Sequence, residues 1–169
     1  KGIGPCYEDK IARVGIRMID LLNPEVLKEK IEKNLKIKNN LFEKYFGKPA
    51  MSFDEIYNEF LEIGKQLQDR IVDTELELNE AIRDNKNILF EGAQALMLDI
   101  DFGTYPYVTS SSPSTGGVCT GAGVPPTSLQ NLIGVSKAYT TRVGHGPFPT
   151  ELDNDLGEHI RKVGHEYGA

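Results

Sequence analysis

The stretch NKNILFEGAQALMLDIDFGTYPYVTSSSPSTGG, residues 85–117, gives the clearest indication of the fold. Its apolar run at 88–90 follows a polar turn and breaks abruptly before Gln94. A fully buried strand of a parallel sheet has this pattern, and such sheets bind ligands just beyond the carboxyl ends of their strands. The pattern therefore predicts an α/β fold with a parallel sheet, in which Gln94 lies at the ligand-binding crevice.

Gln94 carries a side-chain amide with one acceptor and two donors, a set that matches the lactam edge of a 6-oxopurine. A buried structural glutamine that ties the turn to backbone amides is an equal alternative. The hydroxyl run 109–115 offers donors for an anion, although such runs also form ordinary loops. From the residues alone, both questions stay open.

Asp99 and Asp101 lie two positions apart, so an extended backbone would point both carboxylates to one side. Such a pair suits a magnesium ion or a general base. Carboxylates beside a turn more often accept hydrogen bonds from backbone N–H groups, and we favour this interpretation. The three histidines fit no zinc spacing, and the sequence shows no Ser/His/Asp or Cys/His arrangement.

The composition argues against several classes of protein. A formal net charge of −6 over 169 residues disfavours nucleic-acid binding, which requires basic surfaces. No apolar run reaches the length of a membrane span. Cys6 and Cys119 form no CxxC pair, which favours a reducing, cytoplasmic compartment. The chain starts at Lys1 without an initiator methionine and stops just after a glycine, so we expect both ends to be cuts through a longer polypeptide.

Residues 1–84 are predicted to form a helical subdomain. Apolar residues recur there at helical spacing, and Asn23-Pro24 and Ser52 with Glu55 are typical of helix starts. The predicted helices cover residues 7–22, 24–46, 53–68 and 73–83.

Lys10, Arg13 and Arg17 would share one face of the first predicted helix, because steps of three and four residues bring side chains together. A solvated basic face is the usual outcome for such residues and is favoured from the residues alone. The alternative is a phosphate site, for which arginine offers a planar bidentate fork.

Residues 85–169 have a different character. The glycine-rich run 117–126 contains neither GxxxxGK[ST] nor GxGxxG, so we interpret it as a connector and not as a phosphate loop. After it we expect a short helix at 127–132, a second strand at 133–143, and a final helix that starts at Asp153 or Asn154.

Three motifs resemble those of the adenylosuccinate synthetase family: GIGPCYEDKIAR at 2–13, FEGAQALMLDIDFGTYPYVTSSSPSTGG at 90–117, and TRVGHGPFPTEL at 141–152. They follow the family's order with similar spacing, and the resemblance spans the whole chain, which corresponds to the middle of a longer polypeptide. It implies part of a mostly parallel central sheet of the P-loop-NTPase-like type. Residues 1–84 would be a helical subdomain and residues 85–169 a sheet portion of one larger domain.

The resemblance also implies an activity in purine nucleotide and AMP biosynthesis. The family ligates IMP and L-aspartate to adenylosuccinate and hydrolyses GTP. GTP phosphorylates the 6-oxygen of IMP, and the aspartate amine then displaces that phosphate. The implied cofactors are GTP and Mg²⁺, with ligands that lie mostly outside this chain, and the implied assembly is a homodimer.

The same motifs assign substrate-binding roles by resemblance. Gln94 is expected to contact the IMP base near its 6-oxygen. Thr109 is expected to belong to the IMP phosphate site, and Val143 to lie beside the IMP ribose.

Arg13 is expected to act in trans, because the matching arginine of the family reaches the IMP phosphate of the neighbouring subunit. Lys10 and Arg17 are expected to support it. With the resemblance included, phosphate binding becomes the favoured interpretation of these basic residues.

No catalytic residue and no metal site is expected in this segment, since the family's catalytic aspartate and histidine lie upstream of the matching region. The isolated segment should therefore not turn over. A different class of function is a non-catalytic binding or dimerisation module that keeps the fold without activity. An unrelated α/β nucleotide enzyme that shares only strand-turn patterns is disfavoured by the density of motifs.

Overall fold

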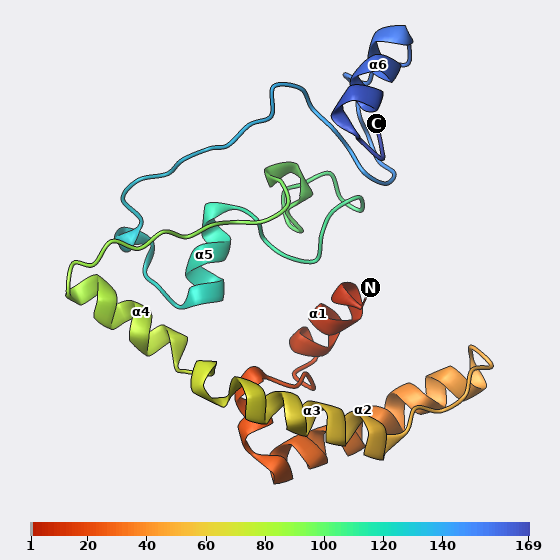
Figure 1. The fold of residues 1–169 in the computed structure, drawn as a ribbon, viewed down its shortest axis with the longest axis vertical. Coiled ribbons are helices and arrows are strands. Elements are labelled where there is room, and N and C mark those ends of the chain that lie inside the picture. Colours follow the sequence, from red (N-terminus) through yellow and green to blue (C-terminus); the bar gives the residue numbers. More distant parts are fainter. Residues whose placement is uncertain (1) are drawn as a thin grey trace. The chain divides into compact units, whose positions relative to one another are not determined.

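The structure, a computed structural model, describes residues 2–169. The chain divides into two compact units, one ending at Asp84 and the other formed by Asn85–Ala169 (Figure 1). The first unit contains α1 (Ile3–Ile11), the 3₁₀ helix η1 (Met18–Leu22), α2 (Pro24–Lys44), α3 (Phe53–Leu67), the 3₁₀ helix η2 (Gln68–Arg70) and α4 (Thr74–Arg83). The second contains the 3₁₀ helix η3 (Leu96–Leu98), α5 (Thr115–Ala122), the 3₁₀ helix η4 (Pro126–Ser128) and α6 (Asp155–Gly164).

Side-chain caps start the two long helices of the first unit. Asn23 Oδ1 accepts a hydrogen bond from the Val26 N–H at 3.2 Å, and Pro24 occupies the first position of α2. Ser52 Oγ accepts a hydrogen bond from the Glu55 N–H at 3.3 Å at the start of α3. Such caps satisfy N–H groups that have no partner within the helix. The predicted starts of both helices are confirmed.

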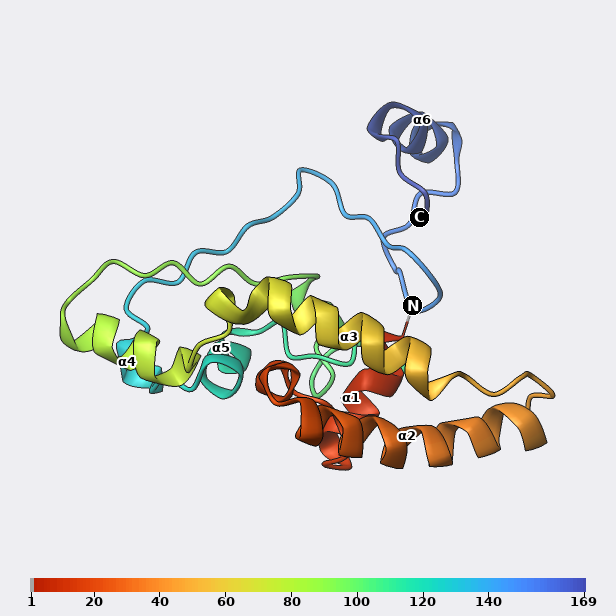
Figure 2. The same cartoon turned by 60° about the horizontal axis from the view of Figure 1, so that its bottom comes forward.

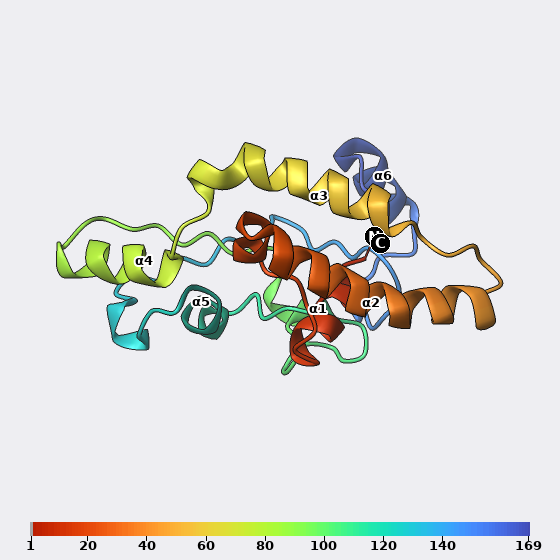
Figure 3. The same cartoon turned by 90° about the horizontal axis from the view of Figure 1, so that it is seen from below.

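The core of the first unit forms where η1, α2 and α3 meet. Leu27 and Ile31 of α2 are 0% and 2% exposed, and Leu21 of η1 is also buried. Helices α2 and α3 run side by side (Figures 2 and 3). Gly64 of α3 permits a close approach, because a Cβ there would lie 2.5 Å from the Leu21 carbonyl oxygen. Partly buried side chains complete this core: Leu35, Phe53, Ile56, Tyr57, Leu61, Ile63 and Ile71.

Helix α1 stops well before residue 22, so the prediction of one continuous helix there is wrong. The Val14 N–H donates to the Asp9 carbonyl at 3.0 Å, and the Arg13 N–H donates to the Lys10 carbonyl at 3.1 Å. Arg13 adopts the left-handed conformation, with a φ of 64°. Together these are the features of a Schellman C-cap, in which the left-handed residue is usually glycine. The apolar spacing continues past this cap, and no glycine at residue 13 marks the end.

Ion pairs attach α1 and η1 to α2. Lys38 Nζ lies 2.7 Å from Asp9 Oδ1, and Lys30 Nζ lies 2.5 Å from Asp20 Oδ2. The same Asp20 oxygen accepts the Arg17 N–H at 2.6 Å. Burial alone would raise the pKa of Asp20, but the hydrogen bonds from Lys30 and from the Arg17 N–H hold it below its ordinary value.

The second unit contains no β-strand, and none occurs anywhere within residues 2–169. The predicted strands at 88–90 and 133–143, and with them the parallel sheet of an α/β fold, are therefore wrong. No backbone hydrogen bond joins these two segments in the described part of the chain. Leu89 is 85% exposed and Val135 97% exposed. A strand needs neighbouring backbone for its N–H and C=O groups, and an apolar run alone does not show that such a neighbour exists.

The helices of the second unit are short. α5 occupies residues that we interpreted as a connector, and Gly123 ends it with a φ of 67°. The helix predicted at 127–132 is wrong, since only the 3₁₀ turn η4 forms there. Asn154 Oδ1 accepts the Gly157 N–H at 3.1 Å, which confirms the start of the final helix. Among residues 2–169, none of the helices combines the length and apolar character that crossing a membrane requires.

Candidate functional site

A cavity of about 390 Å³ in the second unit brings together two of the residues to which the sequence assigned substrate roles. Thr109 and Val143 both line it, although they come from loops that are far apart in the sequence. The cavity falls within the size range of small-molecule sites. The rest of its wall is formed by Leu98, Tyr107, Val108, Arg142 and His145.

Backbone hydrogen bonds hold the loop that carries Thr109. The Thr109 N–H donates to the Leu98 carbonyl at 2.9 Å, and the Ile100 N–H donates to the Ser111 carbonyl at 3.1 Å. Gly103 allows the tight turn between these contacts, because a Cβ there would lie 2.4 Å from the Asp99 carbonyl oxygen. The backbone of Thr109 is thus fixed, while the residue lines the cavity.

Asp99 is buried within this loop. Its Oδ1 accepts the Asp101 N–H at 3.0 Å, the backbone role that we favoured over a magnesium site. That hydrogen bond is the main cause that lowers the pKa of Asp99, against the opposing effect of burial. In the part of the chain that the structure describes, no three His, Cys, Asp or Glu side chains are grouped to hold a metal ion.

Gln94 is exposed and does not line this cavity. Its backbone is in the left-handed region, with a φ of 56°, a conformation that costs a non-glycine residue roughly 1–2 kcal/mol. The exposed side chain contradicts the alternative of a buried structural glutamine. Its amide is available to a ligand.

The three basic residues of the first unit do not share one helix face, and that prediction is wrong. Lys10 lies in the last turn of α1, with its Nζ 5.8 Å from the centroid of the Tyr7 ring. Arg13 lies in the turn that follows α1, and Arg17 is the N-cap of η1. The early end of α1 separates them. All three residues are exposed.

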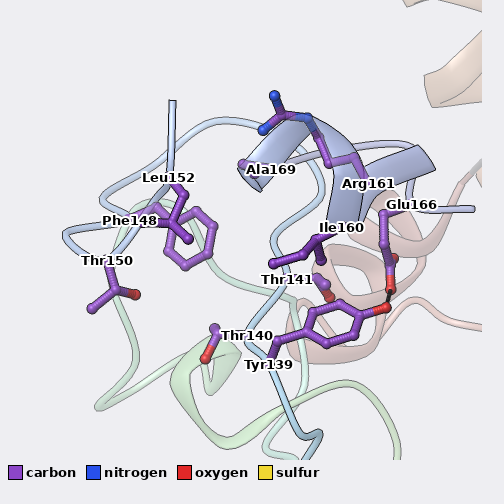
Figure 4. A pocket seen from close by; sticks show the side chains of 11 residues that line it. Tyr139, Thr140, Thr141, Phe148, Thr150, Leu152, Ile160, Arg161, Glu166 and Ala169 are labelled. Atoms are coloured by element: carbon purple, nitrogen blue, oxygen red, sulfur yellow. Dashed lines mark hydrogen bonds between the residues drawn. The ribbon is translucent and has the colours of Figure 1, made fainter. Parts of the chain in front are cut away.

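A second cavity, of about 300 Å³, was missed by sequence analysis (Figure 4). It lies beside α6, and apolar and threonine side chains contribute most of its wall. The Gly/Pro loop at 144–149 was the available signal, since loops of this kind often line sites. The lining residues are Tyr139, Thr140, Thr141, Phe148, Thr150, Leu152, Gly157, Ile160, Arg161, Glu166 and Ala169.

Glu166 accepts two side-chain hydrogen bonds at the edge of this second cavity. Lys137 Nζ lies 2.9 Å from Glu166 Oε1, and the Tyr139 hydroxyl donates to the same oxygen at 3.3 Å (Figure 4 shows the latter). The hydrogen bond from Lys137 is the main cause that lowers the pKa of Glu166. These contacts stabilise the loop around residue 139 against the end of α6.

Comparison with known proteins decides the family. The family model for adenylosuccinate synthetase matches residues 1–169. The chain belongs to the adenylosuccinate synthetase family. The resemblance carried by the three sequence motifs is confirmed.

Relatives named adenylosuccinate synthetase match all 169 residues. Those of Limosilactobacillus fermentum, Bacillus licheniformis and Clostridium kluyveri are 55%, 56% and 56% identical to the chain, which covers 39%, 39% and 40% of their lengths. The solved structure of fully ligated adenylosuccinate synthetase from Plasmodium falciparum is 46% identical, with a TM-score of 0.91. That match covers 99% of this chain and 39% of the other. The chain thus spans about two fifths of the length of these family members.

Proposed function

We propose that this chain supplies much of the IMP site of an enzyme of purine and AMP biosynthesis, which ligates IMP and L-aspartate to adenylosuccinate and hydrolyses GTP. The observation that carries the proposal is the 390 Å³ cavity lined by both Thr109 and Val143. These residues match the family positions for the IMP phosphate and ribose. Membership of the family supports the same activity.

The chemistry requires that the 6-oxygen of IMP become a leaving group. GTP transfers its terminal phosphoryl group to that oxygen and leaves as GDP. The aspartate amine then attacks C6 and displaces phosphate. The amide of Gln94 suits the purine edge, because it can donate to the 6-oxygen and accept from the neighbouring ring N–H. The hydroxyl of Thr109 can donate to a phosphate oxygen, a charge-assisted hydrogen bond.

Backbone strain supports the role of Gln94. Within residues 2–169, the non-glycine residues with positive φ are Arg13, Asn85, Gln94 and His165. Conformations of this kind cost of order 1–3 kcal/mol each and cluster at active sites and ligand clamps. Arg13, Asn85 and His165 lie at the C-terminal ends of α1, α4 and α6, where the left-handed conformation is a common helix cap, whereas Gln94 ends no helix.

Arg13 is proposed to act in trans, on the phosphate of an IMP bound to the other subunit of a homodimer. Its exposed guanidinium supports contact with an anion outside its own unit, and Lys10 and Arg17, which are also exposed, are proposed to support it. The free thiols of Cys6 and Cys119 support a cytoplasmic location. The two compact units are proposed to be parts of one larger domain.

GTP and Mg²⁺ are the cofactors proposed for the whole enzyme. The described residues provide no group of side chains suited to a metal ion, so they do not fit a magnesium site and no step is assigned to one here. The part of this chain in the reaction is to bind and orient IMP.

The first test is GDP release by the full-length protein. Release should require IMP, L-aspartate and GTP together, and residues 1–169 alone should release none. Thr109→Val should raise KM for IMP roughly tenfold, since a hydrogen bond to a charged group contributes about 1.5–3 kcal/mol. The exposed Thr127 of η4 lines neither cavity, so Thr127→Val is the matched control. Full-length protein that binds IMP without releasing GDP would instead favour a non-catalytic binding module.

The second test concerns the role of Arg13 in trans. Arg13→Ala and Gln94→Ala subunits should each be nearly inactive as homodimers. Each mixed dimer retains one complete site, so a 1:1 mixture should recover roughly a quarter of wild-type activity by random pairing. A mixture that stays inactive although the subunits exchange would overturn the in-trans role.

A further inference from the structure

Arg142 connects both walls of the cavity that Thr109 and Val143 line. Its Nη2 donates to the Tyr107 carbonyl at 3.1 Å, on the wall that leads to Thr109. The same nitrogen donates to the His145 carbonyl at 3.0 Å, and Nε donates to that carbonyl at 3.2 Å, on the wall that carries Val143. One guanidinium therefore links two loops that are far apart in the sequence.

The hydroxyl of Thr104 adds a third attachment. Its Oγ1 accepts from Nη1 and Nη2 of Arg142 at 3.4 Å each, and it donates to the Tyr107 carbonyl at 3.2 Å. All the oxygen atoms that accept hydrogen bonds from the guanidinium are neutral. Hydrogen bonds from a charged donor are about twice as strong as neutral ones, which suits a link between loops that lack regular structure.

The chain approaches Arg142 closely at two glycines. A Cβ at Gly146, where φ is 128°, would lie 2.1 Å from Nη2 of Arg142. A Cβ at Gly168 would lie 2.1 Å from the Arg142 carbonyl oxygen. The Arg142 backbone also exchanges two hydrogen bonds of 2.8 Å with Ala169. Three segments of the second unit thus meet at this residue.

We infer that Arg142 is a positioning residue for IMP, which fixes the separation of Thr109 and Val143 across the cavity. The inference rests on the proposed function and adds to it a residue that acts through its neighbours. Arginine presents five N–H donors in a rigid fork, whereas lysine donates from a single nitrogen on a flexible stem. Arg142→Lys keeps the charge but cannot hold the Tyr107 and His145 carbonyls in the same geometry.

The first experiment compares Arg142→Lys with Arg161→Lys in the full-length enzyme. Arg161 lines the second cavity and is the control within the same unit. Arg142→Lys should raise KM for IMP roughly tenfold and leave KM for GTP within about twofold, because the proposed function places IMP, and not GTP, against the linked loops. Gly146→Ala, which would crowd the retained guanidinium, should shift KM for IMP in the same direction. An unchanged KM for IMP, or equal rises for IMP and GTP, would overturn the inference.

The second experiment measures amide hydrogen exchange in the full-length enzyme, a readout that does not need activity. Arg142→Lys should speed exchange at residues 104–109 roughly tenfold and leave the helices of the first unit unchanged. Unchanged exchange at 104–109 would overturn the link itself. A wild-type enzyme without turnover would defeat the proposed function, whereas the exchange result would still decide whether Arg142 joins the two loops.

Discussion

The two units of this chain are stabilised in different ways. In the first, apolar side chains from η1, α2 and α3 close over Leu27, which is fully buried. In the second, apolar residues such as Leu89 and Val135 lie in solvent, and polar contacts around Asp99 and Arg142 order the loops instead. A packed apolar core supports a scaffold, whereas polar links between loops would hold the proposed ligand-binding positions at defined separations.

The largest expected effect is on the apolar core of the first unit. Leu27→Ala should lower the free energy of unfolding by about 2–5 kcal/mol, because it leaves a cavity among packed side chains. Leu89→Ala, the same change at an exposed site, should alter it by less than about 0.5 kcal/mol. Urea unfolding followed by the helical circular dichroism signal compares the two. Equal losses would show that the second unit also has a packed core.

Replacing a glycine by alanine should destabilise the protein in the first unit and stabilise it in the second. Gly64→Ala would bring a Cβ to 2.5 Å from the Leu21 carbonyl oxygen, so we expect a loss of about 1–3 kcal/mol. Gly121 in α5 has open space around its Cβ position, and Gly121→Ala should stabilise by up to about 1 kcal/mol through helix propensity. The melting temperatures of both variants, compared with that of the wild type, show whether each substitution stabilises or destabilises the protein. A stable Gly64→Ala protein would contradict the close packing of α3 on η1.

Relieving backbone strain at Gln94 and at His165 should stabilise the protein in both cases but impair IMP binding in only one. Gln94 and His165 both have a left-handed backbone conformation, which glycine adopts without strain. Gln94→Gly and His165→Gly should therefore each raise the free energy of unfolding by about 0.5–1 kcal/mol. Only Gln94→Gly should impair IMP binding, since His165 has no proposed role. Melting temperatures and IMP titrations of the two full-length variants test this pairing. Loss of IMP binding in both variants would remove the argument from strain.

The smallest expected effect depends on pH. Because the pKa of Asp20 is lower in the folded chain than its ordinary 3.8, its carboxylate stabilises the fold above that value. This stabilisation is lost as the pH falls through the folded pKa. Asp20→Asn should therefore flatten the dependence of stability on pH below about 4, whereas Asp69→Asn, at an exposed aspartate of η2, should not. Identical pH profiles for both variants would contradict the role given to the Lys30–Asp20 pair.

Local signals predicted part of this fold correctly. Asn23, Ser52 and Asn154 are caps whose effect lies within three residues, so the helix starts could be read from the sequence. The end of α1 was missed because arginine, and not glycine, occupies the left-handed position at residue 13. The strand predictions were wrong for another reason. An apolar run indicates that a segment can be buried, but it does not show that a neighbouring strand is present to accept and donate its backbone hydrogen bonds.

The site could be predicted only where a motif carried it. The family resemblance predicted roles for Thr109 and Val143, and both residues line one cavity in the structure. Arg142 stands directly before Val143 in the same motif, yet its contacts to Thr104 and Tyr107 depend on a tertiary arrangement that spacing does not encode.

We propose that IMP occupies the cavity between Thr109 and Val143. The most direct measurement is methyl NMR on the full-length protein with labelled threonine and valine, titrated with IMP and, separately, with guanosine. On addition of IMP, we expect the Thr109 and Val143 methyl signals to shift together with one Kd, while the Thr127 signal stays fixed. Guanosine should leave all three signals unchanged. IMP that saturates the enzyme without moving either the Thr109 or the Val143 signal would contradict this proposal.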